Sequence, residues 1–258
     1  MLVPIYVWGA YGSPGGWTAR TTLGFLLVHL ALYPGANAFN SAYDRDTGPI
    51  GGLARPPAVP PGLALGSVLL QGAGLALSAL VGARFLLAYL ALWAIFTAYS
   101  HPAVRWKRSP VLSTASIVGG QGGLGWYLGW TAASGPGSPD AAGAGSLVAA
   151  CAGVAALYPL TQVYQVADDA ARSERTLAAA LGVRGTFLWV AGGLAILAAA
   201  AGALRHLGLA IVVLHGALAS GAVAALRPAG WTPSQPWVMA VAYANSTALL
   251  LYMIVTWN

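Results

Sequence analysis

Long apolar stretches constrain the fold of this chain more than any other feature of its sequence. Because none of them alternates as a strand would, and an open sheet edge cannot face lipid, each is expected to form a helix. The sequence predicts an all-α, polytopic transmembrane helix bundle that forms a single domain over residues 1–258. Eight stretches come close to the length of about 20 residues that crosses a bilayer: Thr22–Tyr43, Gly62–Val81, Phe85–Ser100, Val111–Trp130, Ala142–Tyr164, Thr186–Leu204, Leu207–Leu226 and Pro236–Trp257.

The shortage of charge agrees with a lipid environment. Only 7% of the residues are charged and 58% are hydrophobic, whereas soluble domains carry about a quarter charged residues. We therefore expect an integral, multi-pass membrane protein that is surrounded by the lipid bilayer.

The first residues, MLVPIYVWGAYGSPGG, are apolar but too short to cross a bilayer as a helix. They lack the basic start and long apolar core of a signal peptide. We interpret them as the remnant of a ninth span, or as a start codon set too late. The expected architecture is eight full spans plus this short N-terminal segment.

The basic residues fall mainly on one side of the predicted bundle. An excess of basic residues marks the cytoplasmic side, so topology accounts for the net charge of +6 and no nucleic-acid partner is expected. The opposite side keeps only Arg20, Arg84 and Arg205. The richer side holds Arg45, Arg55, Arg105, Lys107, Arg108, Arg172, Arg175, Arg184 and Arg227.

Two stretches of the chain resemble each other and both end in acidic residues. ALYPGANAFNSAYDRD covers Ala31–Asp46, and ALYPLTQVYQVADD covers Ala156–Asp169. The repeat suggests two pseudo-repeated halves, residues 1–131 and 132–258. Charge that served only solubility would scatter over all the loops, so the acids of these two loops indicate a bound cation. They are Asp44, Asp46, Asp168, Asp169 and Glu174.

Both stretches also place two amides and an acid at a spacing that shares one helix face. These are Asn37, Asn40 and Asp44 in the first, and Gln162, Gln165 and Asp169 in the second. Pro34 and Pro159 are expected to kink the two helices and to free a carbonyl in each. Amides inside a membrane bundle mark a binding site, and the matched carboxylates favour this for the set, although for Asn37 or Gln162 taken singly we favour hydrogen bonds that join helices.

Oxygen ligands of this kind suit Mg²⁺, which proteins commonly share with substrate phosphates. His29, His101, His206 and His215 are scattered along the chain, so zinc, haem and iron–sulfur sites are not expected. Carboxylates, a metal and basic side chains together can bind a diphosphate. The basic residues expected around the acids are Arg55, Arg105, Lys107, Arg108, Arg172 and Arg175.

Three segments, in this order, resemble the motifs of the UbiA superfamily of intramembrane prenyltransferases. They are NSAYDRDTGPIGGLARPP (Asn40–Pro57), YSHPAVRWK (Tyr99–Lys107) and QVADDAARSERTLAAALG (Gln165–Gly182). The similarity extends over nearly the whole chain and implies a nine-span arrangement. The sequence departs from the family pattern at Gly48 and Gln165, where acids are usual, and it offers Asp46 and Asp168 nearby.

The resemblance implies Mg²⁺-dependent transfer of an isoprenoid chain from a prenyl diphosphate to an acceptor, such as an aromatic or quinone head group or another lipid precursor. It implies catalytic roles for Asn40, Asp44 and Asp169, with Asp46 and Asp168 as further metal ligands. The substrate-binding residues that it implies are Arg55, Arg105, Lys107, Arg172, Arg175, Tyr43, Tyr99, Tyr164, Asn37 and Gln165.

Aromatic rings are expected to stabilise the allylic cation that forms in such a reaction, with Tyr43, Tyr99 and Tyr164 the favoured residues. Trp126 and Trp130 are expected in an interfacial belt on the opposite side. Two alternatives remain open: a terpene cyclase of the same superfamily, and a non-enzymatic carrier of an anionic lipid or phosphate ester.

Overall fold

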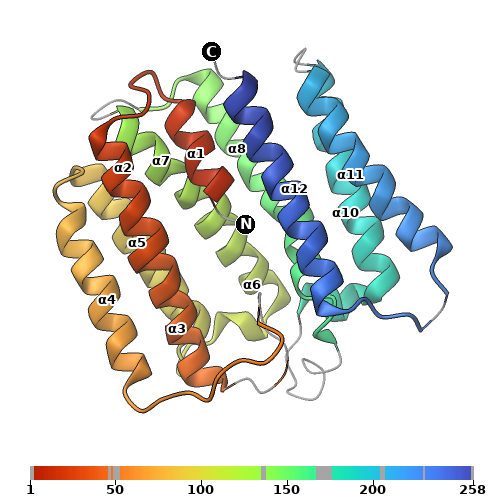
Figure 1. Ribbon diagram of the computed structural model, residues 1–258, viewed down its shortest axis with the longest axis horizontal. Helices are drawn as coiled ribbons and strands as arrows, with labels where there is room; N and C mark the ends of the chain where they lie inside the picture. Colours follow the sequence, from red (N-terminus) through yellow and green to blue (C-terminus); the bar gives the residue numbers. More distant parts are fainter. Residues whose placement is uncertain are drawn as a thin grey trace.

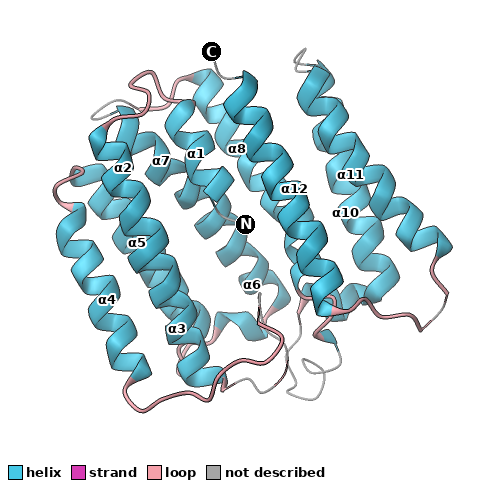
Figure 2. Cartoon of the chain, viewed as in Figure 1, coloured by secondary structure: helices cyan, strands magenta, loops and turns pink. Residues whose placement is uncertain are grey.

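The computed structural model is helical, and no strand occurs among the residues that it describes (Figure 2). These are residues 3–45, 48, 53–134, 138–166, 176–203, 207–228 and 230–256. The helices form a bundle of roughly parallel rods, with the loops gathered at its two ends (Figure 1). The prediction of an all-α bundle is confirmed.

Each of the eight predicted spans corresponds to one helical rod. Several rods contain more than one helical segment, and the first of them is α2 (Ala19–Leu26), π-helical η1 (Leu27–Leu32) and α3 (Tyr33–Asp44). The fourth is α6 (Pro110–Ile117), π-helical η3 (Val118–Leu124) and α7 (Gly125–Ser134). The others are α4 (Leu63–Ser78), α5 (Ala83–Ser100), α8 (Ala141–Leu157), α10 (Leu177–Ala203), α11 (Leu207–Leu226) and α12 (Gln235–Thr256).

Five helical stretches among the described residues are long and apolar enough to cross a membrane: Ala19–Asp44, Ala83–Ser100, Ala141–Thr161, Leu177–Ala203 and Gly208–Leu226. The apolar helix α4 is shorter, with 16 residues. The structure therefore supports a protein with several membrane spans. It confirms five of them by length and composition, and the predicted number of eight full spans stays a prediction.

Pro34 has no N–H, which changes the hydrogen bonding of the first rod. Pro34 cannot donate to the carbonyl of Leu30, and the turn just before it is the π-helical η1. There the N–H of Tyr33 donates to the carbonyl of Val28. At the start of the rod, Thr18 caps α2 and exchanges hydrogen bonds with Thr21. The rod thus runs unbroken to Asp44.

The N-terminal segment forms a short helix, α1 (Val3–Tyr11), inside the bundle. It packs against α7 and also contacts α8 and α12 (Figure 1). A Cβ at Gly129 would meet the carbonyl oxygen of Tyr6, and one at Gly9 would meet that of Trp126. Glycine is needed at both positions because the two backbones approach so closely.

The expected aromatic belt at Trp126 and Trp130 is wrong. These side chains are 0% and 2% exposed, and their rings stack at 5.1 Å between α1, α7 and α8. The indole N–H of Trp126 donates to Ser146 Oγ at 3.1 Å. Burial against α1 replaces the membrane interface as their environment, and the sequence carries no signal that α1 packs there.

In its described part, residues 156–166, the second repeated stretch is not the continuous helix that its spacing suggested. α8 ends at Leu157 and is followed by a 3₁₀ turn, η4 (Tyr158–Thr161), and by turns that include Gln162 and Gln165. The two glutamines therefore do not share an α-helical face. Pro159 is the physical reason, because its ring excludes the carbonyl of Ala155 from a normal helical hydrogen bond. That freed carbonyl accepts a hydrogen bond from the Trp189 indole of α10 at 3.0 Å.

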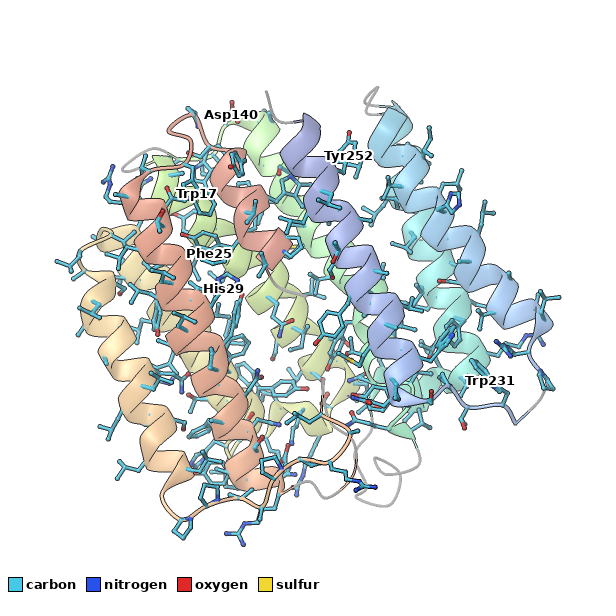
Figure 3. The ribbon with its side chains drawn as sticks, in the orientation of Figure 1. Trp17, Phe25, His29, Asp140, Trp231 and Tyr252 are labelled. Atoms are coloured by element: carbon cyan, nitrogen blue, oxygen red, sulfur yellow. The ribbon has the colours of Figure 1, made fainter. Side chains whose placement is uncertain are left out.

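The bundle has two chemically different ends. In Figure 3, Asp140 lies at one end and Trp231 at the other. The described basic residues Arg45, Arg55, Arg105, Lys107, Arg108, Arg184 and Arg227 belong to helix termini and loops at the Trp231 end, and Arg20 and Arg84 to the Asp140 end. The predicted asymmetry of basic charge is therefore present in three dimensions.

Candidate functional site

Three polar side chains meet where α3 ends. Asn40 and Asp44 lie one turn apart on the same face of α3, as predicted. The ammonium group of Lys107, from the 3₁₀ turn η2 (Trp106–Arg108), contacts Asp44 Oδ2 and lies 3.5 Å from Asn40 Oδ1. Arg105 approaches from the same loop, with its Nη2 at 3.3 Å from Asp44 Oδ1. We call these four residues the ion cluster.

The ion cluster is largely withdrawn from solvent. The side chains of Asp44, Lys107 and Arg105 are 5%, 8% and 17% exposed, respectively. Ion pairs gain strength where water is excluded, but burying charge costs free energy unless every charge is paired. The Asp44 carboxylate and the basic side chains of Arg105 and Lys107 therefore interact at short range in a largely water-free environment.

Local backbone geometry brings the basic side chains to α3. Pro102 ends α5, and the following turn is closed by the N–H of Arg105, which donates to the carbonyl of His101 at 2.8 Å. Arg105 itself is left-handed, with φ of 47°, a conformation that non-glycine residues rarely adopt. This turn reverses the chain so that Lys107 points back to the end of α3.

Ser100 is a member of the site that the sequence analysis did not single out. Its hydroxyl is at the end of α5 and donates to Asn40 Oδ1 at 2.8 Å. The contact fixes the orientation of the Asn40 amide, whose oxygen faces Lys107. Ser100 lies within the motif segment Tyr99–Lys107, which is the sequence feature that could have indicated it. Its contact with Asn40 could not be predicted, because that contact depends on how α3 packs against α5.

A second polar network surrounds the hydroxyl of Tyr158 at the start of η4. Ser113 Oγ lies 2.6 Å from it, the hydroxyl of Tyr99 lies 3.2 Å away, and Gln162 Nε2 donates to it at 2.8 Å. Gln162 Oε1 accepts from the N–H of Ala178 at 3.4 Å. The network joins α5, α6, η4 and α10, so Gln162 does connect helices, as one of its two open interpretations proposed.

Of the three tyrosines predicted to stabilise an allylic cation, Tyr43 directly precedes Asp44 of the ion cluster. Tyr43 packs edge-on against Phe39 and against His101, with ring centroids 4.9 Å and 5.6 Å apart. Tyr99 belongs to the Tyr158 network, and Tyr164 is half-buried in the turn after η4. These rings come from α3, from α5 and from the segment after α8.

The remaining predicted site residues are exposed, half-buried or outside the described residues. Asn37 and Arg55 are exposed and form no hydrogen bond or ion pair with described residues. Gln165 is half-buried and follows η4. Asp46, Asp168, Asp169, Arg172 and Arg175 lie outside the described residues.

The donor set of the ion cluster fits a hard cation. Within the described part of the chain, no three His, Cys, Asp or Glu side chains form a metal-binding group. Nevertheless, the Asn40 and Asp44 oxygens converge on one point, because the same Lys107 nitrogen contacts both. A carboxylate and an amide oxygen around one cationic position are the ligand types that Mg²⁺ prefers.

A cavity of about 720 Å³ lies at the same end, on another face of α3. Ala42, Arg45 and the segment Pro56–Ala64 line it, whereas Asn40 and Asp44 do not. It is bounded mostly by proline and aliphatic side chains. We therefore locate the polar chemistry at the ion cluster and not in this cavity.

Comparisons with known proteins agree with this architecture. The chain matches the UbiA prenyltransferase family over residues 1–245. Its fold is similar to that of a UbiA homolog from Archaeoglobus fulgidus bound to DMAPP and Mg²⁺, with a TM-score of 0.73, 19% identity, and coverage of 98% of this chain and 93% of that chain. For the same homolog bound to GPP and Mg²⁺, the TM-score is 0.72 and the identity 20%, with the same coverage.

A further structural relative is a digeranylgeranylglyceryl phosphate synthase, with a TM-score of 0.64, 15% identity, and coverage of 99% of this chain and 91% of that chain. A comparison with curated protein sequences finds no match. This chain belongs to the UbiA prenyltransferase family, a family of integral membrane proteins. The resemblance inferred from the three motif segments is thereby confirmed.

Proposed function

We propose that this protein transfers an isoprenoid chain from a prenyl diphosphate to a small-molecule or lipid acceptor within the membrane, in a Mg²⁺-dependent reaction. The observation that carries the proposal is the convergence of Asn40 Oδ1 and Asp44 Oδ2 on one cationic group, Lys107. The UbiA homolog that binds DMAPP or GPP with Mg²⁺ has a similar fold and supports the same assignment.

In this proposal, Asn40 and Asp44 bind the metal together with Asp46, Asp168 and Asp169, and the metal, when bound, neutralises charge on the leaving diphosphate. Lys107 releases the Asp44 carboxylate and moves to the diphosphate oxygens, and Arg105 joins it. Arg55, Arg172 and Arg175 supply further positive charge from the adjoining loops. Charge-assisted hydrogen bonds of this kind are about twice as strong as neutral ones.

The bond between the allylic carbon and the diphosphate oxygen breaks with its electron pair on the diphosphate. The acceptor attacks the carbon and loses the proton of its attacking atom to the released diphosphate. Tyr43, Tyr99 and Tyr164 stabilise the positive charge on the isoprenoid through their ring faces. The low exposure of the ion cluster excludes water, which would otherwise capture that carbon. Asn37 and Gln165 hydrogen-bond the substrate at the mouth of the site.

We place this end of the bundle on the cytoplasmic side. The support is the basic charge described above, with seven described Arg and Lys residues at the Trp231 end against two at the other. We also propose that residues 1–258 act as one domain, since polar networks and apolar contacts join the helices of both halves.

The decisive experiment measures pyrophosphate release from geranyl diphosphate by the protein in lipid nanodiscs. We expect release that requires Mg²⁺, stops on chelation, and is lost in Asp44→Asn. A prenylated acceptor as product supports the transferase, whereas a cyclic hydrocarbon formed without an acceptor contradicts it in favour of the cyclase. Tight donor binding with no release at any donor chain length identifies a carrier instead.

A further inference from the structure

A second basic pocket lies away from the ion cluster, at the same end of the bundle. It is a cavity of about 200 Å³ between the start of α10, the end of α11 and the loop that leads to α12. Arg184 and Arg227 both line it, together with Phe187 and Trp231. None of these residues belongs to the motif segments Asn40–Pro57, Tyr99–Lys107 and Gln165–Gly182.

The two arginines carry charge that no acidic side chain balances within the described residues. Neither forms an ion pair or a side-chain hydrogen bond there, and both are exposed. The guanidinium of Arg227 stacks on the ring of Trp231 at 4.7 Å, which orients the charge without neutralising it. Arginine presents several N–H donors in a plane and is well suited to a phosphate group.

Two aromatic residues that line the pocket, Phe187 and Trp231, pack against each other and against Trp237. Trp231 packs edge-on against Trp237 at 5.8 Å, and Phe187 lies 6.1 Å from Trp231 and 6.0 Å from Trp237. Figure 3 shows Trp231 at this end of the molecule, below α10 and α11. Such rings belong at the boundary between lipid and water, where head groups lie.

An exposed leucine lies close to each of the two arginines along its helix. Leu188 lies one turn beyond Arg184 on α10 and is 53% exposed, and Leu226 directly precedes Arg227 and is 80% exposed. A ligand held by both arginines would therefore have an apolar surface beside it. The cavity is also below the size of about 300 Å³ at which pockets for whole small molecules begin.

We propose that this pocket binds the phosphate of an anionic membrane lipid, with Arg184 and Arg227 on the phosphate oxygens and the acyl chains along α10 and α11. The inference does not depend on the proposed transferase activity. Because the pocket joins α10 to the loop before α12, the bound lipid ties these elements together at the membrane surface. Inorganic phosphate presents the same oxygens as the lipid phosphate, so the test below distinguishes the lipid from inorganic phosphate.

The test uses the full chain in phosphatidylcholine nanodiscs that contain some phosphatidylglycerol, and native mass spectrometry counts the retained phosphatidylglycerol. Loss of a charged hydrogen-bonding partner predicts about tenfold weaker retention in Arg184→Gln and in Arg227→Gln. The matched control is Arg108→Gln, an exposed arginine at the same end, for which general surface attraction predicts a loss of about fivefold at most.

Thermal unfolding shows whether each variant is folded. Trp231→Leu is a further test, because it removes the ring that orients Arg227 and should also lower the retention of phosphatidylglycerol. Equal losses in all three arginine variants would overturn the proposal, because they indicate a diffuse surface effect. Displacement of the lipid by inorganic phosphate, or retention of phosphate in place of lipid, would contradict a lipid as the ligand.

Discussion

The ammonium group of Lys107 contacts Asp44 Oδ2 and lies 3.5 Å from Asn40 Oδ1, so one lysine bridges both oxygens of the candidate metal site. A metal ion and this ammonium cannot occupy the same point. If Asn40 and Asp44 bind the metal as proposed, Lys107 has to leave this position, and the proposal directs it to the oxygens of the diphosphate.

We expect Lys107→Gln to lower the rate of pyrophosphate release about a hundredfold, the loss typical when one charge-stabilising donor is removed. The same variant should bind Mg²⁺ more tightly in the absence of substrate, because the competing ammonium is gone. Calorimetric titration with Mg²⁺ and a pyrophosphate assay measure the two effects. Arg108→Gln, in the same 3₁₀ turn but exposed, shows how much of each effect comes from losing a nearby positive charge that is not part of the ion cluster. Unchanged metal affinity would argue against Lys107 as the occupant of the metal position.

Ser100→Ala removes the hydroxyl that orients the Asn40 amide. The expected cost is about 1 kcal/mol, the value of one hydrogen bond, and it should appear as a severalfold higher Mg²⁺ concentration for half-maximal activity. Ser116→Ala is the matched control, since among the described residues Ser116 Oγ bonds to the carbonyl of Leu112 in its own helix and to no other group. If both variants respond alike to Mg²⁺, Ser100 has no role in positioning Asn40.

Tyr158→Phe removes the oxygen that Ser113, Tyr99 and Gln162 share. Because the amide of Gln162 is then left buried without this partner, we expect the free energy of unfolding to fall by about 1–3 kcal/mol. Thermal unfolding in detergent provides the measurement. The control is Tyr127→Phe, whose hydroxyl forms no hydrogen bond with described residues. Equal stability of the two variants would show that the network contributes little.

Gly129→Ala tests the close approach of α1 to α7. The added methyl group would meet the carbonyl oxygen of Tyr6, and overpacking of this kind costs about 1–3 kcal/mol. In contrast, Gly192→Ala in α10 adds a methyl group in open space and should be neutral or slightly stabilising. Thermal unfolding compares the two. A lower melting temperature in Gly192→Ala than in Gly129→Ala would contradict the packing.

The positions of the helices could be predicted because apolar length alone locates a membrane helix. The expected span Thr22–Tyr43 lies within the observed Ala19–Asp44. α10 begins at Leu177, but the backbone of Gly182 is non-helical, with φ of 68°, and divides α10 into two helical pieces. The expected span that starts at Thr186 falls in the second piece, because a glycine and the charged Arg184 weaken the apolar signal before it.

Less of the candidate site than of the helix positions could be predicted from the sequence. The spacing of Asn40 and Asp44 predicted their shared face, because α-helix geometry fixes it. The partners Ser100 and Lys107 arrive through the packing of α5 and a left-handed turn at Arg105, which no periodicity encodes. For Gln162, the same spacing rule failed because Pro159 had already ended the helix.

The contrast between α3 and η4 bears on which insertions and deletions the protein tolerates. In α3, adding or deleting one residue between Asn40 and Asp44 rotates one of them by about 100° around the helix axis, so their oxygens no longer face the same lysine. Gln162 and Gln165 lie in turns after η4, so no α-helical phase fixes the spacing between them. Over evolutionary time, the first repeated stretch must therefore keep its length between Asn40 and Asp44, whereas the helix rule sets no such limit between Gln162 and Gln165.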